Sequence, residues 1–451
     1  MEARKKFKKI NLFKINLKNI SFFLLSLLPF AIIIGQAPSD IIISLISIFF
    51  LINCILKNDW KWIKIKWIKF IFLLWIYLIF ASFFALNLKI AFEHSILFLR
   101  FFIFAISLQY WIITDKKFLN YIFYSLTIAF IFVFIDTFYQ FLNFDLSKGY
   151  GPDILGYYSN DHFRLTGPFR SNIPGAYLSK FFFLVFLFIL IKFKENKKNI
   201  IFLCFIIASF LLIFLTGEAM SFASIGLGLI ILFLFEKKYR KKIIYSLGIT
   251  FFLIFLVVKY NPVWNKIEII EKNPWHNGTV YEVKVKCEHD KNKLCKKKFK
   301  TQPFFYEVIS NFKESAYWET YNQAFTIWKD YPLFGIGIKN YTNACKLDKY
   351  KNNLKYFFCT THPHNFYIQW LLETGIIGLI GFLILLFLWF EYFIKNIDKQ
   401  NPLLYAPILT LFVLFWPIMS TGSFFSNRNA TMNWFIIALC LAIIKFKNKK
   451  V

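Results

Sequence analysis

The chain has 451 residues, of which 58% are hydrophobic, and it carries a formal net charge of +29. Its mean hydropathy of +0.52 and its 62 phenylalanines exclude an ordinary soluble domain. The positive charge would suit a nucleic-acid-binding protein, but the lysines lie in short clusters between apolar runs, as the anchors of membrane helices do. The composition therefore predicts a multi-pass membrane protein with membrane lipid, and no nucleic acid, as its partner.

About twelve apolar runs approach the roughly 20 residues that an α-helix needs to cross a bilayer. They cover residues 20–36, 39–56, 67–86, 92–113, 119–141, 172–193, 199–216, 219–235, 243–259, 366–394, 402–420 and 429–446. Basic connectors lie between alternate runs, and all of them fall on the cytoplasmic side if the N-terminus is cytoplasmic. These connectors are 57–66, 114–118, 192–199, 236–242, 395–400 and the C-terminal tail.

Two longer segments then fall on the opposite side of the membrane. Residues 142–171 are rich in the turn residues Gly, Pro and Asp. Residues 260–365 are long enough for a small subdomain, so we expect nine spans in 1–259, this subdomain, and three spans in 366–451. Within it, residues 317–329 are expected to be helical because large apolar residues recur there at helical spacing.

Four of the cysteines lie in the subdomain: Cys287, Cys295, Cys345 and Cys359. In an oxidising compartment an even number of cysteines favours disulfides. We predict the pairs Cys287–Cys295, which would close a hairpin after the alternating "TVYEVKVK", and Cys345–Cys359. Four free thiols are the alternative, and zinc is disfavoured because neither pair has CxxC spacing.

The densest polar cluster is "THPHNFYIQWLLETGIIG", residues 361–378, at the edge of the tenth apolar run. Pro363 suits the first turn of a helix, which would place Thr361 or His362 near its N-cap. On that helix a polar stripe recurs at i, i+4 and i+8, formed by Asn365, Gln369 and Glu373.

Three interpretations of this cluster are open. The polar residues can serve as hydrogen bonds between helices, with a histidine as a cap. His362 and His364 can be two ligands of a metal whose third ligand comes from elsewhere. A histidine can also act catalytically beside a phosphorylated lipid, because polar residues within a membrane usually face a cavity or a partner helix.

The segment "THPHNFYIQWLLETGIIGLIGF" resembles the signature of the O-antigen ligase and O-antigen polymerase superfamily. Three further stretches are similar to elements of that superfamily and occur in the same order. They are "RLTGPFRSNIPGAYLSKF" at 164–181, "LTGEAMSF" at 215–222 and "YWETYNQAFTIWKDYPLFGIGIKNY" at 317–341. The resemblance covers most of residues 120–395.

The resemblance implies an all-α, GT-C-like polytopic fold with about twelve transmembrane helices and a large periplasmic loop subdomain before the tenth. It implies an enzyme of the bacterial inner membrane with a periplasmic active face. Such an enzyme transfers a glycan from undecaprenyl diphosphate to an acceptor hydroxyl, with inversion and without a metal or other cofactor. The acceptor is lipid A–core sugar in ligases and a carrier-linked glycan in polymerases, and we favour the ligase.

The resemblance also implies roles for individual residues. His364, with His362 beside it, is the candidate that assists the acceptor hydroxyl, because histidine has a pKa near neutral. Arg164 and Arg170 are the candidates for the diphosphate, whose charge suits a guanidinium. No metal ligand is expected.

One position departs from the superfamily pattern. The branch that this chain resembles has Thr/Ser-Gly-Glu-Arg after the seventh span, whereas this chain has Ala219 after Glu218. Arg164 or Arg170 can take the place of the missing arginine, the chain can be an inactivated variant, or the alignment can be shifted. Glu218 without a cationic neighbour would be a costly charge at a membrane edge.

Two functions of other classes fit the sequence less well. A transporter or flippase of lipid-linked sugars would be expected to show internal symmetry and paired discontinuous helices, and the sequence shows neither. A purely structural membrane protein would not need His, Arg and Glu gathered at one face.

Overall fold

The computed structural model describes residues 16–145, 149–159, 164–169, 173–193, 195–260, 268–273, 278–286, 294–301, 310, 312–351, 359–396 and 405–445. Ten helices in this part of the chain are long and apolar enough to cross a membrane. They are α2 (Leu17–Ile34), α3 (Gln36–Lys57), α4 (Lys66–Ala81, which continues through a turn to Phe84), α5 (Leu88–Ser107), α6 (Lys116–Leu142), α7 (Pro174–Lys192), α8 (Glu195–Leu215), α10 (Arg240–Tyr260), α16 (Phe366–Asn396) and α18 (Asn427–Ile444). The protein is therefore an all-α polytopic membrane protein, as predicted.

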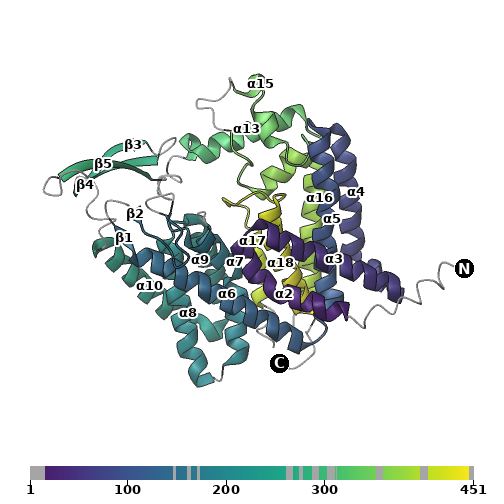
Figure 1. The fold of residues 1–451 in the computed structure, drawn as a ribbon, viewed down its shortest axis with the longest axis horizontal. Coiled ribbons are helices and arrows are strands. Elements are labelled where there is room, and N and C mark those ends of the chain that lie inside the picture. Colours follow the sequence, from purple (N-terminus) through teal and green to yellow (C-terminus); the bar gives the residue numbers. More distant parts are fainter. Residues whose placement is uncertain are drawn as a thin grey trace, which may run out of the picture.

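Two shorter apolar helices, α9 (Ala219–Phe235) and α17 (Tyr405–Leu414), complete the bundle. Each of the twelve apolar runs in the sequence overlaps one of these helices. The last-but-one run differs most, because α17 ends at Leu414 and the chain from Phe415 to Ser426 is not helical. That non-helical stretch crosses the top of the bundle and contributes to the site described below (Figure 1).

The segment before α16 contains both helices and strands. The predicted helix is present as α13 (Ala316–Asp330), and its N-cap Ser315 accepts a hydrogen bond from the Trp318 amide at 3.1 Å. The short helices α14 (Tyr341–Cys345) and α15 (Asp348–Lys351) follow it. Figure 1 places this lobe beyond one end of the bundle.

A three-stranded antiparallel sheet lies at the same end, in the order β3 (Glu268–Asn273), β4 (Gly278–Lys286) and β5 (Leu294–Thr301). The hairpin expected around "TVYEVKVK" is thus present as β4 and β5, with Thr279 opposite Thr301 and Lys286 opposite Leu294. The strands β1 (Phe144–Asp145) and β2 (Gly149–Tyr150) form a second, two-stranded pair. Short non-α turns occupy Lys61–Lys64, Ser82–Phe84, Leu108–Ile112, Gly167–Phe169, Lys237–Tyr239 and Phe312–Glu314.

Basic helix ends meet at the opposite end of the bundle. Lys18 at the start of α2 donates to Thr114 Oγ1 at 2.6 Å, and Lys445 after α18 donates to the Gln109 carbonyl at 3.1 Å. Lys66 at the start of α4 pairs with Glu391 near the end of α16 at 3.4 Å. These contacts bring together connectors that the sequence assigns to one side of the membrane.

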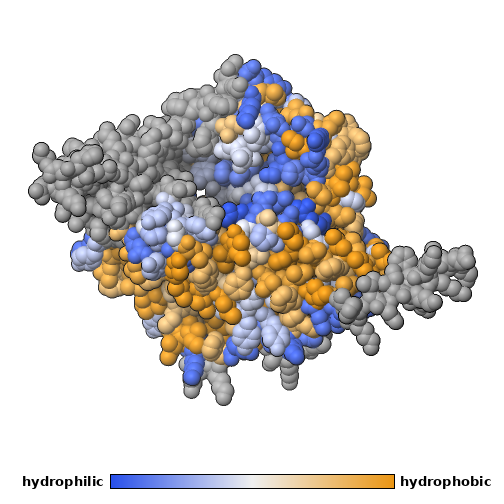
Figure 2. All heavy atoms as spheres, in the orientation of Figure 1, coloured by the Kyte–Doolittle hydropathy of each residue, from blue (hydrophilic) through white to orange (hydrophobic). Residues whose placement is uncertain are grey.

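The surface separates into zones that match this arrangement. Figure 2 shows hydrophobic residues in a belt around the bundle and hydrophilic residues on the lower ends of the helices. A hydrophilic band lies above the belt, between it and the lobe that contains α13. A bilayer would cover the belt and leave that band at its surface.

Aromatic residues fill the space where α5, α16 and α18 meet. Phe424 and Phe425, from the chain between α17 and α18, stand within 6 Å of the Trp370 ring of α16. Phe425 also contacts Phe98 of α5 at 5.3 Å between ring centroids, and all of these side chains are buried. Burial of such large rings anchors the non-helical chain before α18 against the bundle.

Candidate active site

The two histidines lie immediately before α16 rather than in its first turn. The N-cap is Asn365, whose Oδ1 accepts hydrogen bonds from the Tyr367 and Ile368 amides at 2.9 and 3.2 Å. The prediction that Thr361 or His362 caps the helix was therefore wrong. Asn365 is itself a favoured capping residue with a short acceptor side chain, and it outcompetes the proline signal two residues earlier.

His362 uses both ring nitrogens. Its Nδ1 lies 2.8 Å from Thr361 Oγ1 and its Nε2 lies 3.0 Å from the carbonyl oxygen of Thr421. A carbonyl only accepts, so Nε2 carries the proton and Nδ1 accepts from the threonine hydroxyl. His362 is thus held as one neutral tautomer beside His364, whose ring centroid is 4.2 Å away.

His364 adopts a left-handed backbone conformation, with φ of 56°. This region is uncommon for residues other than glycine, and such strain is concentrated at functional sites. The Thr421 amide fixes the turn by donating to the His364 carbonyl at 2.9 Å, and the ring meets the edge of Tyr317 from α13.

Burial lowers the pKa of both histidines. The pKa of His362 falls to about 4, because burial disfavours its charged form and the His364 and Lys339 charges add to this effect. The pKa of His364 is lowered by burial, which outweighs the opposite effect of a hydrogen bond that the ring donates to the Thr421 backbone. Both rings are therefore neutral near pH 7, the state that a general base requires.

The polar stripe on α16 holds neighbouring segments in place. Asn365 Nδ2 donates to the Pro417 carbonyl at 2.8 Å. Gln369 donates to Ser423 Oγ at 2.8 Å and accepts from the Phe424 amide at 2.8 Å. These bonds join the start of α16 to the non-helical chain before α18 rather than to another helix, and they position the chain that contacts both histidines.

Glu373, the third member of the stripe, is fully buried. Its carboxylate accepts from Gln369 Nε2 at 3.1 Å and from the Lys339 amide at 2.9 Å. Lys339 thereby enters the site region in a left-handed conformation, with φ of 64°. The carboxylate fixes the Lys339 backbone, and the Lys339 charge acts on His362.

Two glycine motifs interlock beside this carboxylate. The helix α16 is interrupted at Gly375, which has φ of 68°, and the Ile376 amide donates to the Pro332 carbonyl at 2.9 Å. The amides of Ile336 and Gly337 donate to carbonyls of α16 at 3.0 and 2.9 Å. A Cβ on Gly335 would collide with the backbone of Gly375. The segments 332–337 ("PLFGIG") and 373–375 ("ETG") therefore form one backbone junction.

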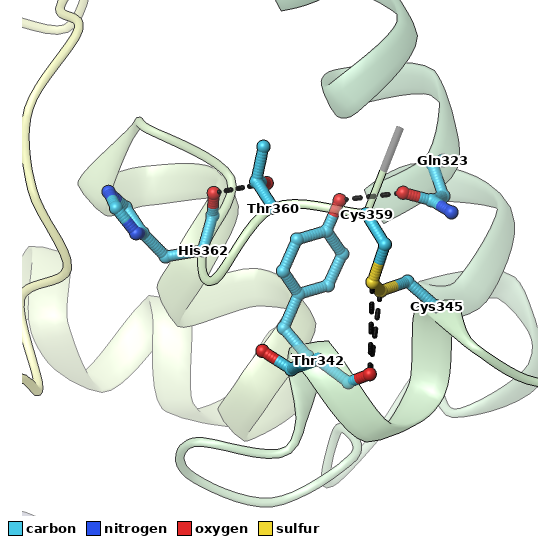
Figure 3. Close-up of a disulfide and its surroundings, with 7 residues drawn as sticks. Gln323, Thr342, Cys345, Cys359, Thr360 and His362 are labelled. Carbon is cyan, nitrogen blue, oxygen red and sulfur yellow. Dashed lines mark hydrogen bonds between the residues drawn. A yellow bond between two sulfur atoms is a disulfide. The ribbon is translucent and has the colours of Figure 1, made fainter. Parts of the chain in front are cut away.

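A disulfide holds the chain that leads into the histidines (Figure 3). Cys345 and Cys359 are joined, with 5.8 Å between their Cα atoms, as the sequence predicts. Beside it, Thr360 Oγ1 donates to the His362 carbonyl at 2.8 Å, and the imidazole of His362 points away from the sulfurs. Of the other predicted pair, Cys295 lies in β5 and Cys287 lies outside the described residues.

Arg164 lies on a loop that α6 fixes. Gln140 of α6 accepts from the Thr166 and Gly167 amides at 2.8 and 2.9 Å and donates to the Tyr157 carbonyl at 3.2 Å. The Arg164 side chain is half-buried, and its charge acts on Glu218. Arg170, the second predicted diphosphate ligand, lies outside the described residues.

Glu218 is bound by the N-terminus of α7. Its carboxylate accepts from the Gly175 amide at 2.7 Å and the Ala176 amide at 2.9 Å. Burial raises the pKa of Glu218 to about 7, while the Arg164 charge and these amides oppose that rise. A helix N-terminus is a favourable site for an anion, so these two amides stabilise the Glu218 carboxylate beside Ala219.

The chain from the end of α17 to the first turn of α18 contacts both the histidines and the loop that carries Arg164. Thr421 contacts both histidines, and Tyr321 of α13 donates to the Met419 carbonyl at 3.2 Å. Arg428, in the first turn of α18, donates to the Phe169 carbonyl at 3.3 Å, close to the Arg164 loop. The sequence predicted none of these roles, although the largely polar run "STGSFFSNRN" at 420–429 was a signal that the chain between the last two helices could form contacts of its own.

The described part of the chain contains no group of three or more His, Cys, Asp or Glu side chains that could hold a metal ion. Two groups of candidate residues are present. Two neutral imidazoles lie before α16, and a buried carboxylate, on which the Arg164 charge acts, lies at the N-terminus of α7. This combination suits proton transfer next to an anionic group.

Comparison with known families identifies one matching family model. Residues 202–383 match the family model described as O-antigen ligase, a range that includes Glu218, both histidines and the glycine junction. The resemblance to the O-antigen ligase and O-antigen polymerase superfamily is thereby confirmed, and the match supports an enzyme of that general type. No curated protein matches the chain.

Proposed function

Because residues 202–383 match the O-antigen ligase family, we propose that this chain transfers a glycan from undecaprenyl diphosphate to an acceptor sugar hydroxyl. The proposed acceptor is lipid A–core. The proposed setting is the bacterial inner membrane, with the histidine and arginine clusters on its periplasmic face. The observation that carries the proposal is His364, a neutral imidazole held in a strained turn. The chain before α18 contacts this turn through Thr421, and Arg428 at the start of α18 contacts the loop that carries Arg164.

In the proposed reaction the acceptor hydroxyl oxygen attacks the anomeric carbon and forms the new glycosidic bond. The bond from that carbon to the diphosphate oxygen breaks, with inversion, and both its electrons leave with the diphosphate. His364 takes the hydroxyl proton, and Thr421 orients the imidazole for this step through its backbone. Arg164 stabilises the charge that develops on the leaving diphosphate.

The polar band above the hydrophobic belt supports this setting (Figure 2). A lipid-linked donor needs its reacting carbon at the bilayer surface and its prenyl chain in the hydrocarbon layer. The clusters lie at helix ends opposite the basic ends, where such a headgroup would arrive.

A polymerase that joins carrier-linked repeat units is the second candidate, because the family match covers both reactions. The lipopolysaccharide pattern of a strain that lacks this chain separates them. Loss of every glycan-capped band is expected for the ligase. Bands that carry a single repeat unit would establish the polymerase, and an unchanged pattern would contradict both.

A further inference from the structure

Lys180 lies in the second turn of α7, and the mechanism above does not use it. Its ammonium donates to Asn433 Oδ1 of α18 at 3.2 Å. The side chain is only half-buried, and within the described residues it forms no ion pair. An ammonium has three N–H donors, so further donors are available to a ligand. A charged lysine in a membrane bundle is a candidate for function because it is costly to keep there.

The groups beside Lys180 point to an acceptor that the chain itself does not supply. Asn433 is fully buried, and its Nδ2 has no hydrogen-bond partner among the described residues. The hydroxyl of Tyr177, three residues before Lys180 on the same face of α7, is also buried and without a partner there. Buried donors are normally satisfied, so these two indicate a missing acceptor.

Glu218 is near this group but is committed elsewhere. Its two oxygens accept from the Gly175 and Ala176 amides at the start of α7, one turn before Lys180. The Lys180 and Glu218 charges attract each other without making a close ion pair. The charge of Arg164 also acts on Glu218. Two cations therefore interact with one carboxylate that the helix N-terminus already stabilises.

We propose that Lys180 and the Asn433 amide bind an anionic oxygen of the phosphate class. Resting on the proposed function, this oxygen belongs to the diphosphate of the glycan donor, between Lys180 and Arg164. Lys180 then supplies the positive charge in a region where the family resemblance places an arginine and this chain has Ala219. A compact ammonium suits a single phosphate oxygen, whereas a guanidinium binds two in a fork.

The test measures binding of undecaprenyl diphosphate to the full chain in nanodiscs at pH 7.5 with EDTA. Lys180→Met should weaken binding by about 10- to 100-fold, and Lys180→Arg by about threefold or less, because the charge is kept. Lys192→Met is the matched control, since Lys192 is exposed at the other end of α7 over the Tyr124 ring. Equal affinity of Lys180→Met and the natural chain would overturn the proposal.

Asn433→Asp provides a second variant in case Lys180→Met does not fold. It keeps the contact to Lys180 but places a carboxylate opposite the ammonium. We expect weaker binding of undecaprenyl diphosphate, again by about tenfold or more, because the ammonium is then paired within the protein. Unchanged affinity in Asn433→Asp would contradict the assignment.

Competitors identify the source of the phosphate. Inorganic diphosphate should displace undecaprenyl diphosphate from the natural chain, and phosphatidylglycerol at the same concentration should not. A dependence on Lys180 that appears only with phosphatidylglycerol would overturn the diphosphate assignment and identify a membrane phospholipid instead.

Glycan transfer, measured on the same samples, separates this inference from the proposed function. Transfer by the natural chain with an unchanged donor KM in Lys180→Met would contradict the inference alone. Absence of transfer by the natural chain, together with Lys180-dependent binding of undecaprenyl diphosphate, would contradict the proposed function alone.

Discussion

At the scale of single residues, the structure distinguishes the two histidines. Both nitrogens of His362 are engaged, by Thr361 and by the Thr421 carbonyl, whereas His364 carries the strained backbone. His364→Ala should lower the transfer rate by about 10²- to 10⁴-fold, the usual contribution of a general base. His362→Ala should cost about tenfold or less, because it removes a supporting contact.

The rates of the two variants, measured with saturating donor, check this assignment. Thermal unfolding of both should remain near that of the natural chain. A larger loss in His362→Ala than in His364→Ala would reverse the roles.

The lowered pKa of His364 predicts the pH dependence of transfer. A base acts in its neutral form, so activity falls as the pH decreases through the pKa of the free enzyme. Burial moves that pKa below the ordinary value of 6.5, and the acid limb of kcat/KM should therefore lie below pH 6.5. An acid limb centred above pH 6.5 would show that another group, or a charged imidazole, controls the reaction.

Single residues also show what sequence patterns leave out. The catalytic candidates could be identified because their residue types match the chemistry and the motif. The capping role of Asn365 and the engagement of Glu218 by α7 could not, because each depends on a partner from a distant segment. The sequence shows a carboxylate at Glu218 but gives no sign that the Gly175 and Ala176 amides donate hydrogen bonds to it.

At the scale of elements, the junction between Gly335 and Gly375 is the most constrained feature near the site. Both glycines have positive φ, and a Cβ on either would meet the backbone of the opposite segment. Gly375→Ala should destabilise the protein by about 3 kcal/mol, from backbone strain and the clash together. Gly248→Ala is the control, because that glycine of α10 has open space around it and a helical backbone.

Thermal unfolding of the two glycine variants in detergent measures this difference. Gly248→Ala should be neutral or slightly stabilising, since alanine favours a helix. Equal melting temperatures for both variants would contradict the junction.

The Cys345–Cys359 disulfide should stabilise the chain leading into the histidines. It closes a loop with a sequence separation of 14, for which loss of the bond is expected to cost about 3 kcal/mol. Cys345→Ser should therefore lower the melting temperature and make it insensitive to dithiothreitol. Cys204→Ser, at an exposed free cysteine, should change neither property. Insensitivity of the natural chain to the reductant would argue against the bond.

The helices themselves were largely predictable, since apolar runs of bilayer length leave few alternatives for a chain of this composition. The eleventh run was extended too far, because "FWPIMS" at 415–420 is apolar enough to continue a span. Hydrogen bonds with Asn365 and Gln369 instead hold this part of the chain in a non-helical conformation. Hydropathy does not account for such hydrogen bonds. The sequence therefore did not predict the non-helical segment 415–426 that contacts the histidines.

At the scale of the whole molecule, basic connectors and polar segments lie at opposite ends of the helix bundle, and the candidate residues that the structure describes are all at the polar end. Lys-rich connectors meet at one end of the bundle, and the histidine, arginine and disulfide-bonded segments lie towards the other. The side of the membrane could be proposed from sequence because loop charge follows a simple rule. The path by which α13, α16 and the chain before α18 converge could not, since it depends on tertiary contacts.

The most direct measurement is in vitro glycan transfer by the purified full chain, from an undecaprenyl diphosphate-linked glycan to lipid A–core, with EDTA present. We predict transfer by the natural chain and a loss of about 10²-fold or more in folded His364→Ala. No transfer to either lipid A–core or a carrier-linked glycan by the natural chain, or full transfer by His364→Ala, would contradict the account.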